Sequence, residues 1–320
     1  MAHEKTALVL GATGGIGGEV ARRLAERGWQ VRALNRDPAK LTNEAKAGIT
    51  WIEGDAMRTD DVVAAARGAS LIVHAVNPPG YRRWSELVLP MLESTIAAAR
   101  ASGARIVLPG TVYNFGPDAF PEVDETSAQK PGTRKGAIRV EMERRLEAAS
   151  GEGVRTLIVR AGDFFGPKAA NNWFSQGLVK PGQPVSRISY PGKRGTGHQW
   201  AYLPDVAETM VRLIEREGAL DAFAVFHMEG HWDADGSEMI GAIRRATGKP
   251  GLKAGAFPWW LVTLASPVVP LFKEMGEMRY LWQVPLRMGN QRLRSVLGEE
   301  PHTPLDAAVR ATLKGLGSLG

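Results

Sequence analysis

The 320-residue chain contains no cysteine. This excludes disulfides, zinc–thiolate sites and cysteine nucleophiles. The absence suits the cytoplasm, where thiols stay reduced, and a cytoplasmic location is expected. The start of the chain also lacks the shape of a signal peptide, because the apolar run 7–10 leads straight into a glycine-rich turn.

Long apolar runs are scarce as well. The most apolar segment, Phe257–Phe272, is shorter than the roughly 20 residues that a membrane-crossing helix needs, and it contains Pro258, Pro267 and Pro270. We therefore expect no membrane span. The segment is interpreted as a buried cap over a substrate pocket, and the alternative is an anchor at a membrane surface.

The chain has no concentrated basic stripe, although its net charge is +6. Lysines and arginines are scattered and mixed with acids, as in Glu141–Arg145. A small-molecule substrate and an anionic cofactor are therefore expected as partners, and nucleic acid is not. His227 and His231 lie four residues apart, but Gly230 and the strand-like segment 222–226 beside them argue against a shared helical face. No metal site is expected.

Glycine, in contrast, is concentrated at the N-terminal end. An apolar run, 6–10, meets a glycine-rich turn that opens an amphipathic helix. This strand–turn–helix context, with glycines spaced three apart, lets a pyrophosphate approach backbone N–H groups at the positive end of a helix. The plain alternative is a structural glycine turn. We expect dinucleotide contacts from Gly11, Thr13, Gly14, Gly15, Ile16 and Gly17.

Short apolar runs alternate with helical patterns through the first half of the chain. Strands are expected near 6–10, 30–34, 49–52, 71–75, 105–108 and 155–159, and helices near 16–27, 60–67, 84–101 and 135–149. This alternation predicts an α/β fold with a Rossmann-type doubly wound parallel sheet.

Past about residue 162 the alternation loosens, and helical patterns return near 204–217, 237–247 and 303–314. We expect an NAD(P)-binding Rossmann domain over residues 1–162. A smaller C-terminal substrate-binding lobe over 163–320 is expected to be partly interleaved with it. Ligands of such sheets bind beyond the carboxyl ends of the strands.

Several segments together resemble the extended short-chain dehydrogenase/reductase superfamily, its NAD-dependent epimerase/dehydratase group. They are Leu10-Gly-Ala-Thr-Gly-Gly-Ile-Gly17, Glu53-Gly-Asp55, Val73-His-Ala-Val-Asn77, Arg160-Ala-Gly-Asp-Phe-Phe-Gly-Pro167 and Tyr202-Leu-Pro-Asp-Val-Ala207. The resemblance implies that Asp55 and Ala56 meet the adenine and that Ala75 and Val76 flank the cofactor. Expected substrate contacts are Asn77, Asp163, His198 and Trp200. His198 stands where nucleotide-sugar members often carry an arginine, which argues against a nucleotide sugar.

The expected catalytic centre departs from this family. Thr111 matches the family's Ser/Thr, but Lys135 and Arg139 stand where Tyr and Lys of a Tyr-x-x-x-Lys pair are expected. Tyr113 is the preferred proton donor, and Lys135 is the second candidate if burial lowers its pKa. Two alternatives stay open. The chain is a non-catalytic NADP(H)-binding sensor or regulatory protein, or Lys135 and Arg139 are surface residues and Thr111 caps a turn.

The end of the second expected strand favours NADP(H) over NAD(H). It reads Leu34-Asn35-Arg36, with no carboxylate before Asp37, and Arg36 offers a planar fork to a 2′-phosphate. The expected function is NAD(P)-dependent oxidoreduction, or an epimerase-type step, on a small carbonyl or hydroxyl compound. A homodimer is one possible assembly.

Overall fold

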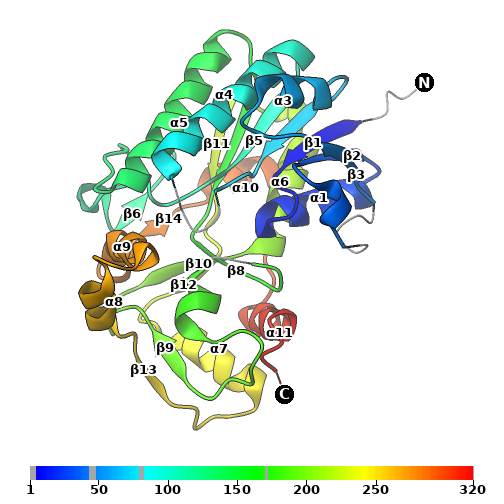
Figure 1. Cartoon of the computed structure of the whole chain (residues 1–320). Helices are drawn as coiled ribbons and strands as arrows, with labels where there is room; N and C mark the ends of the chain where they lie inside the picture. Colours follow the sequence, from blue (N-terminus) through cyan, green and yellow to red (C-terminus); the bar gives the residue numbers. More distant parts are fainter. Residues whose placement is uncertain (1–4, 43–47, 79–82, 170–171, 320) are drawn as a thin grey trace.

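The computed structural model describes residues 5–42, 48–78, 83–169 and 172–319. Within them, a parallel sheet of seven strands has the order β3-β2-β1-β4-β5-β7-β11 (Figure 1). Its strands are β1 (Thr6–Leu10), β2 (Gln30–Asn35), β3 (Thr50–Glu53), β4 (Leu71–His74), β5 (Arg105–Gly110), β7 (Thr156–Arg160) and β11 (Phe223–His227). The predicted Rossmann-type α/β fold is confirmed.

Both faces of this sheet are covered by helices. In β1, Ala7 and Val9 pack into one apolar layer, whereas Leu8 and Leu10 pack into the other. Such strands read as continuous apolar runs because both of their faces are buried. One layer contains α1 (Gly15–Glu26), α6 (Leu203–Glu215) and α10 (Gln291–Leu297), and the other contains α3 (Thr59–Ala65), α4 (Trp84–Ser102) and α5 (Arg134–Gly151).

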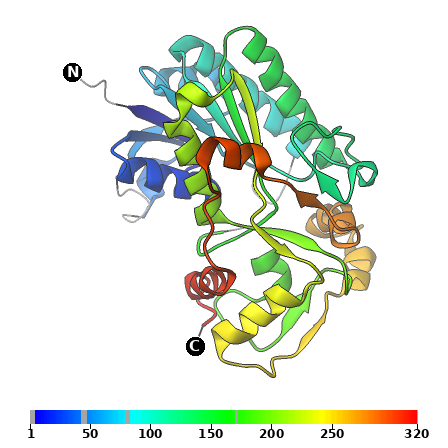
Figure 2. The same cartoon turned by 180° about the vertical axis from the view of Figure 1, so that it is seen from behind.

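The second half of the chain contributes to both parts of the molecule. β11 pairs with β7 in the large sheet, and α6 packs on α1. Figure 2 shows the chain passing from the lobe up to the sheet and back, with α10 against the sheet and α11 (Leu305–Gly315) beside α7 (Ser237–Thr247). The division at residue 162 stays a prediction, and these are the segments that interleave across it.

The lobe is built from small sheets and short helices. β8 (Asp163–Phe165), β10 (His198–Tyr202) and β12 (His231–Asp233) form one sheet, and β9 (Ile188–Tyr190) pairs with β13 (Ala254–Ala256). β6 (Glu122–Val123) pairs with β14 (Arg287–Met288) and ties the loop after β5 to the lobe. Short turns of 3-10 or π-helix occupy 38–40, 117–119, 174–178, 217–219 and 279–282.

The apolar segment Phe257–Phe272 is not buried as a whole, and none of its described residues is among those that line the cavity between the sheet and the lobe. It forms α8 (Trp259–Ala265) and the start of α9 (Pro270–Glu277). Trp260, Leu264 and Val268 are 67%, 72% and 80% exposed, so the expectation that this segment is buried is wrong for α8 and for the turn that follows it. Among the described residues, no helix combines the length and the apolar character needed to cross a membrane.

Candidate active site

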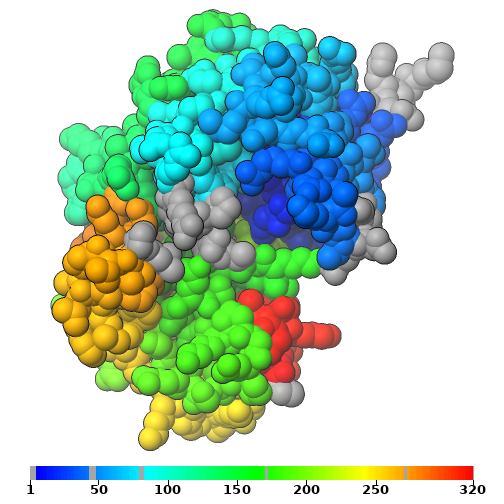
Figure 3. All heavy atoms as spheres, in the orientation of Figure 1, coloured from blue at the N-terminus to red at the C-terminus, as the bar shows by residue number. Residues whose placement is uncertain are grey.

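A cavity of about 770 Å³ lies between the carboxyl edge of the large sheet and the lobe. The turn after β1, the ends of β2, β4 and β5, the start of α5, β8 and α9 all contribute to its lining. The space-filling view shows the surface hollowed where the N-terminal part meets the lobe (Figure 3). This is the edge where open parallel sheets bind ligands.

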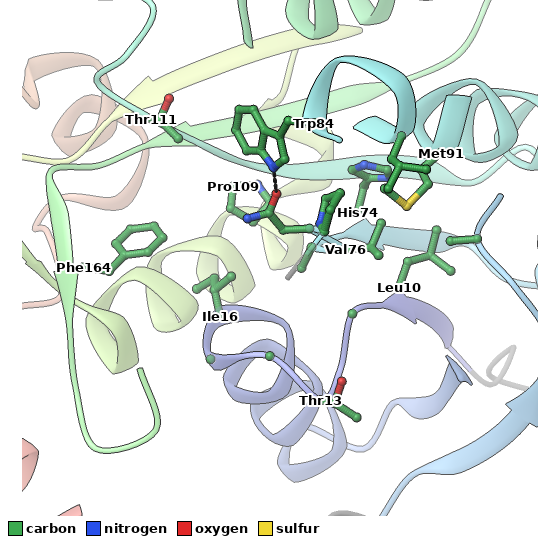
Figure 4. A pocket seen from close by; sticks show the side chains of 18 of the residues that line it. Leu10, Thr13, Ile16, His74, Val76, Trp84, Met91, Pro109, Thr111 and Phe164 are labelled. Atoms are coloured by element: carbon green, nitrogen blue, oxygen red, sulfur yellow. Dashed lines mark hydrogen bonds between the residues drawn. The ribbon is translucent and has the colours of Figure 1, made fainter. Parts of the chain in front are cut away.

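The glycine turn fits a pyrophosphate. A Cβ added to Gly11, which has φ +90°, would lie 2.6 Å from the Ala75 carbonyl carbon, and one on Gly17 would lie 2.3 Å from the Gly11 oxygen. Within the described chain, no side chain caps α1 and its first turn has no acidic residue. Backbone N–H groups at the positive end of α1 are therefore available to an anion. Thr13 and Ile16 lie at this turn (Figure 4).

Of the six residues predicted at this turn, five line the cavity: Gly11, Thr13, Gly14, Gly15 and Ile16. Gly17 is not among the lining residues and is buried. Its role is to let α1 approach the turn, because any side chain there would collide with the Gly11 carbonyl.

The predicted adenine and ribose residues lie at one end of the cavity. Asn35, Arg36, Asp55 and Ala56 all line it. The Asp55 carboxylate accepts a hydrogen bond of 3.0 Å from the Met57 N–H, which fixes this turn. Arg36 is exposed at the rim.

The carboxylate next to Arg36, that of Asp37, is not part of the described lining of the cavity. Asp37 pairs with the Lys40 ammonium at 2.6 Å. Its backbone N–H donates to Asn35 Oδ1 at 2.8 Å. The polar groups at the end of β2 are therefore an amide and a guanidinium.

The segment after β4 forms one wall of the cavity. It includes three predicted lining residues, Ala75, Val76 and Asn77. The Trp84 indole N–H donates to Asn77 Oδ1 at 2.7 Å, the dashed line in Figure 4. This bond connects the start of α4 to the end of β4 and fixes the Asn77 amide.

His74 also lines the cavity, a residue the sequence reasoning quoted without assigning it a role. The Thr95 hydroxyl donates to the Met91 carbonyl at 3.1 Å, so it accepts from His74 Nδ1 at 2.7 Å. Burial, and secondarily the charge of Arg139, lower the His74 pKa to about 3. The ring is therefore neutral at pH 7.

The four predicted catalytic residues, Thr111, Tyr113, Lys135 and Arg139, all line the same cavity. The Thr111 hydroxyl donates to Asn114 Oδ1 at 3.2 Å and accepts from the Tyr113 N–H at 3.3 Å. The Arg139 guanidinium lies 5.1 Å from the centre of the Trp84 ring and donates to the Pro109 carbonyl at 3.5 Å.

Lys135 is buried, so the alternative that it is a surface helix residue is wrong. Its Nζ lies 2.9 Å from Glu274 Oε2 and donates to the Glu274 carbonyl at 3.0 Å. Its backbone N–H donates to Glu277 Oε1 at 3.1 Å. Burial lowers the Lys135 pKa, while the carboxylate of Glu274, on α9 of the lobe, opposes that shift. The two halves of the molecule therefore meet at this lysine.

A chain of hydrogen-bonded polar side chains, buried or half-buried, connects Thr111 to Arg160. Asn114 donates to Gln129 Oε1 at 2.8 Å, and Gln129 donates to Glu143 Oε2 at 3.3 Å. Glu143 forms a buried ion pair with Arg160. Since burial and the Arg160 charge lower the His227 pKa to about 3, its neutral Nε2 accepts from Arg160 at 2.9 Å. This connection was not predicted from the sequence.

The predicted substrate residues fall into two groups. Asn77 and Asp163 line the cavity, whereas His198 and Trp200 are absent from its described lining. His198 lies directly behind Asp163, with Nε2 2.9 Å from Asp163 Oδ2. Trp200 is fully buried in the core of the lobe. Lining residues that the sequence reasoning missed include Glu274, Met275 and Met278.

His227 and His231 lie in different surroundings. His227 ends β11 and meets Arg160, while His231 begins β12, with its ring 4.4 Å from that of His302. No group of three or more metal-ligating side chains occurs among the residues that the structure describes.

A doubly wound parallel sheet whose glycine turn opens onto such a cavity defines a dinucleotide-binding Rossmann protein. The NAD(P)H-binding family model matches residues 11–189, and the chain belongs to that family. The resemblance to the extended short-chain dehydrogenase/reductase superfamily is confirmed by this match and by the fold of the solved relatives.

Three relatives illustrate the likeness. Phenylcoumaran benzylic ether reductase TP7 of Nicotiana tabacum is 27% identical over 60% of this chain and only 58% of that protein. A 3-diazoavenalumate denitrifying reductase of a Streptomyces species is 26% identical over 93% of this chain and 96% of that protein. The structure of MoeE5 in complex with UDP-glucose and NAD has a TM-score of 0.74 at 17% identity, covering 97% of this chain and 98% of that one.

Proposed function

We propose that the protein is an NADPH-dependent reductase of a small carbonyl compound. The observation that carries this proposal is a single cavity that joins the glycine turn to Thr111, Tyr113, Lys135 and Arg139. The reductases among its sequence relatives support reduction, whereas the fold is equally that of epimerases. An epimerase-type step on a hydroxyl compound is therefore the nearest alternative.

The chain's own residues suit proton delivery. When bound, the nicotinamide group supplies a hydride at its C4. Lys135, held as an ammonium by Glu274, offers a proton to an oxygen in the cavity, and the Tyr113 phenol is the other donor within the same lining. The Thr111 hydroxyl, now donating to Asn114, can rotate to donate to that oxygen.

Arg36 supports NADP(H) over NAD(H). A ribose 2′-hydroxyl is usually held by a carboxylate, but Asp37 is paired with Lys40, and the side chains lining the cavity at the end of β2 are Asn35 and Arg36. A guanidinium binds phosphate oxygens through paired N–H groups.

The test has two stages. Binding of NADPH and NADH is measured by quenching of tryptophan fluorescence, and NADPH consumption is then followed with a panel of aldehydes and ketones. The proposal expects tighter binding of NADPH and turnover of at least one uncharged carbonyl. Tight binding without turnover across the panel would favour the sensor alternative, and failure to bind either dinucleotide would refute both.

A homodimer and a cytoplasmic location remain predictions. Sedimentation velocity measures the first, and fractionation of the source cells measures the second.

A further inference from the structure

One carboxylate stands out in the substrate half of the cavity. Asp163 lies at the start of β8, is 92% buried (8% exposed), and lines the cavity. Its Oδ2 accepts a hydrogen bond of 2.9 Å from His198 Nε2. Among the described residues, Oδ1 has no hydrogen-bond partner. Oδ1 is not one of the fully buried polar atoms that lack a partner, so a ligand donor can reach it from the cavity.

His198 is itself held in place. Its ring stacks on Trp282, with centroids 3.6 Å apart and an interplanar angle of 10°, and meets the edge of Trp200 at 4.9 Å. A carboxylate only accepts hydrogen bonds, so His198 Nε2 must be the donor. The histidine therefore fixes one oxygen of Asp163 and leaves the other facing the cavity.

The surroundings of Asp163 do not suit a diphosphate. The second carboxylate of this region, Glu274, is paired with Lys135. Lys193 and Arg194 are not part of the described lining. Of the cations that are, Lys135 is paired with Glu274 and Arg139 lies against the Trp84 ring. The lobe side of the lining combines the apolar or aromatic side chains of Phe164, Trp173, Met275 and Met278 with the uncharged amides of Asn172 and Gln176.

We propose that Asp163 selects substrates that carry a hydroxyl or amino donor and no phosphate. Such a donor would give Oδ1 a hydrogen-bond partner, whereas a phosphate would be repelled by the negative charge of the Asp163 carboxylate. The proposal rests on the proposed function only in taking this cavity as the substrate site. It separates the chain from solved relatives of the same fold whose structures contain UDP-sugars.

The experiment measures binding without turnover. Protein with and without NADP⁺ is titrated calorimetrically with 3- and 4-hydroxybenzaldehyde and with their methyl ethers. UDP-glucose is the phosphate probe. The variants are Asp163→Asn and Asp163→Ala, and the matched control is Asp221→Asn, an exposed aspartate whose carboxylate pairs with Arg292.

In wild type, at least one hydroxyl probe should bind about tenfold to a hundredfold more tightly than its methyl ether, the range for a hydrogen bond to a charged group. Asp163→Asn should lower this ratio by about fivefold to tenfold because a neutral amide accepts more weakly. Asp163→Ala should bring the ratio near one, and Asp221→Asn should leave it unchanged. UDP-glucose should bind wild type more weakly than the hydroxyl probe.

A wild-type ratio near one for both pairs overturns the proposal, even if the variants do not fold. The proposal is also overturned if Asp163→Ala still binds the hydroxyl probe more tightly than its methyl ether, or if wild type binds UDP-glucose more tightly than the hydroxyl probe. Failure of NADP⁺ to bind would refute the proposed reductase, but the ratio in cofactor-free protein still decides the role of Asp163.

Discussion

Replacing Lys135 by Met should remove activity and stability together, and a second substitution should separate the two effects. Lys135→Met leaves Glu274 with its carboxylate 87% buried (side chain 13% exposed) and without its 2.9 Å partner. Breaking a buried pair on one side costs about 3–5 kcal/mol in unfolding free energy. Arg134, 3.2 Å from Glu274, compensates in part, so we expect about 3 kcal/mol.

Adding Glu274→Gln to Lys135→Met removes the stranded charge and should recover most of that stability. If Lys135 is the proton donor, turnover should fall by about 10²–10⁴-fold in both the single and the double variant. Urea denaturation measures the stability, and NADPH consumption on the best carbonyl substrate measures the rate. Activity that returns in the double variant would mean that the loss was structural.

Full activity in Lys135→Met would refute the role of the lysine and leave Tyr113 as the donor. Tyr113→Phe should then lower turnover by about 10²–10⁴-fold while NADPH affinity stays nearly constant. Since both residues line one cavity, the two variants together decide between them.

The remaining predictions concern the cofactor and pH. Arg36→Ala should weaken NADPH binding by about tenfold or more and leave NADH unchanged in fluorescence titration; equal wild-type affinities, unchanged in the variant, would contradict this. Gly14→Val should abolish NADPH binding with the fold retained, because its Cβ would meet only the Gly11 oxygen, at 3.3 Å, while its branches occupy the phosphate site. The chain should also lose stability in acid. The folded-state pKa values of His74 and His227 are about 3, so the unfolded chain binds more protons as the pH falls below 6.5. Each histidine should cost about 2 kcal/mol between pH 7 and pH 5, and equal urea midpoints at the two pH values would refute the assignment.

The large sheet could be predicted from the sequence because its signals are local. Each of its first six strands is a short apolar run, and Thr6–Leu10 begins and ends where expected. The others differ by one or two residues, as β5 does in extending to Gly110. Both faces of these strands are buried, so apolarity alone marks them.

That the residues proposed to bind the cofactor line one cavity could be predicted for the same reason. Its residues follow strand ends within a few positions of a motif, as Asn35 follows β2 and Val76 follows β4. The fold brings those ends to one edge, so a motif close to a strand end predicts a place in the cavity.

The substrate half could not be predicted in this way. Strand β10 carries His198 and Trp200, but its sequence pattern does not show which residues lie between them and the cavity. In the structure, Asp163 lines the cavity and His198 is bonded to it from outside the described lining. Glu274 and Met275 reach the cavity from α9, just beyond the apolar segment Phe257–Phe272 for which burial was predicted. The exposure of α8 depends on how that helix packs on the lobe, which no local pattern records.

The position of Lys135 shows that the replacement of the Tyr-x-x-x-Lys pair involves residues outside helix α5. A buried ammonium is costly unless a carboxylate accompanies it, and here that carboxylate is 139 positions away on the lobe. Restoring a tyrosine at 135 alone would strand Glu274, just as Lys135→Met does. Position 135, which we propose as a proton donor, and the lobe helix are therefore coupled through one ion pair. A return to the family's usual chemistry would require changes on both sides of the cavity.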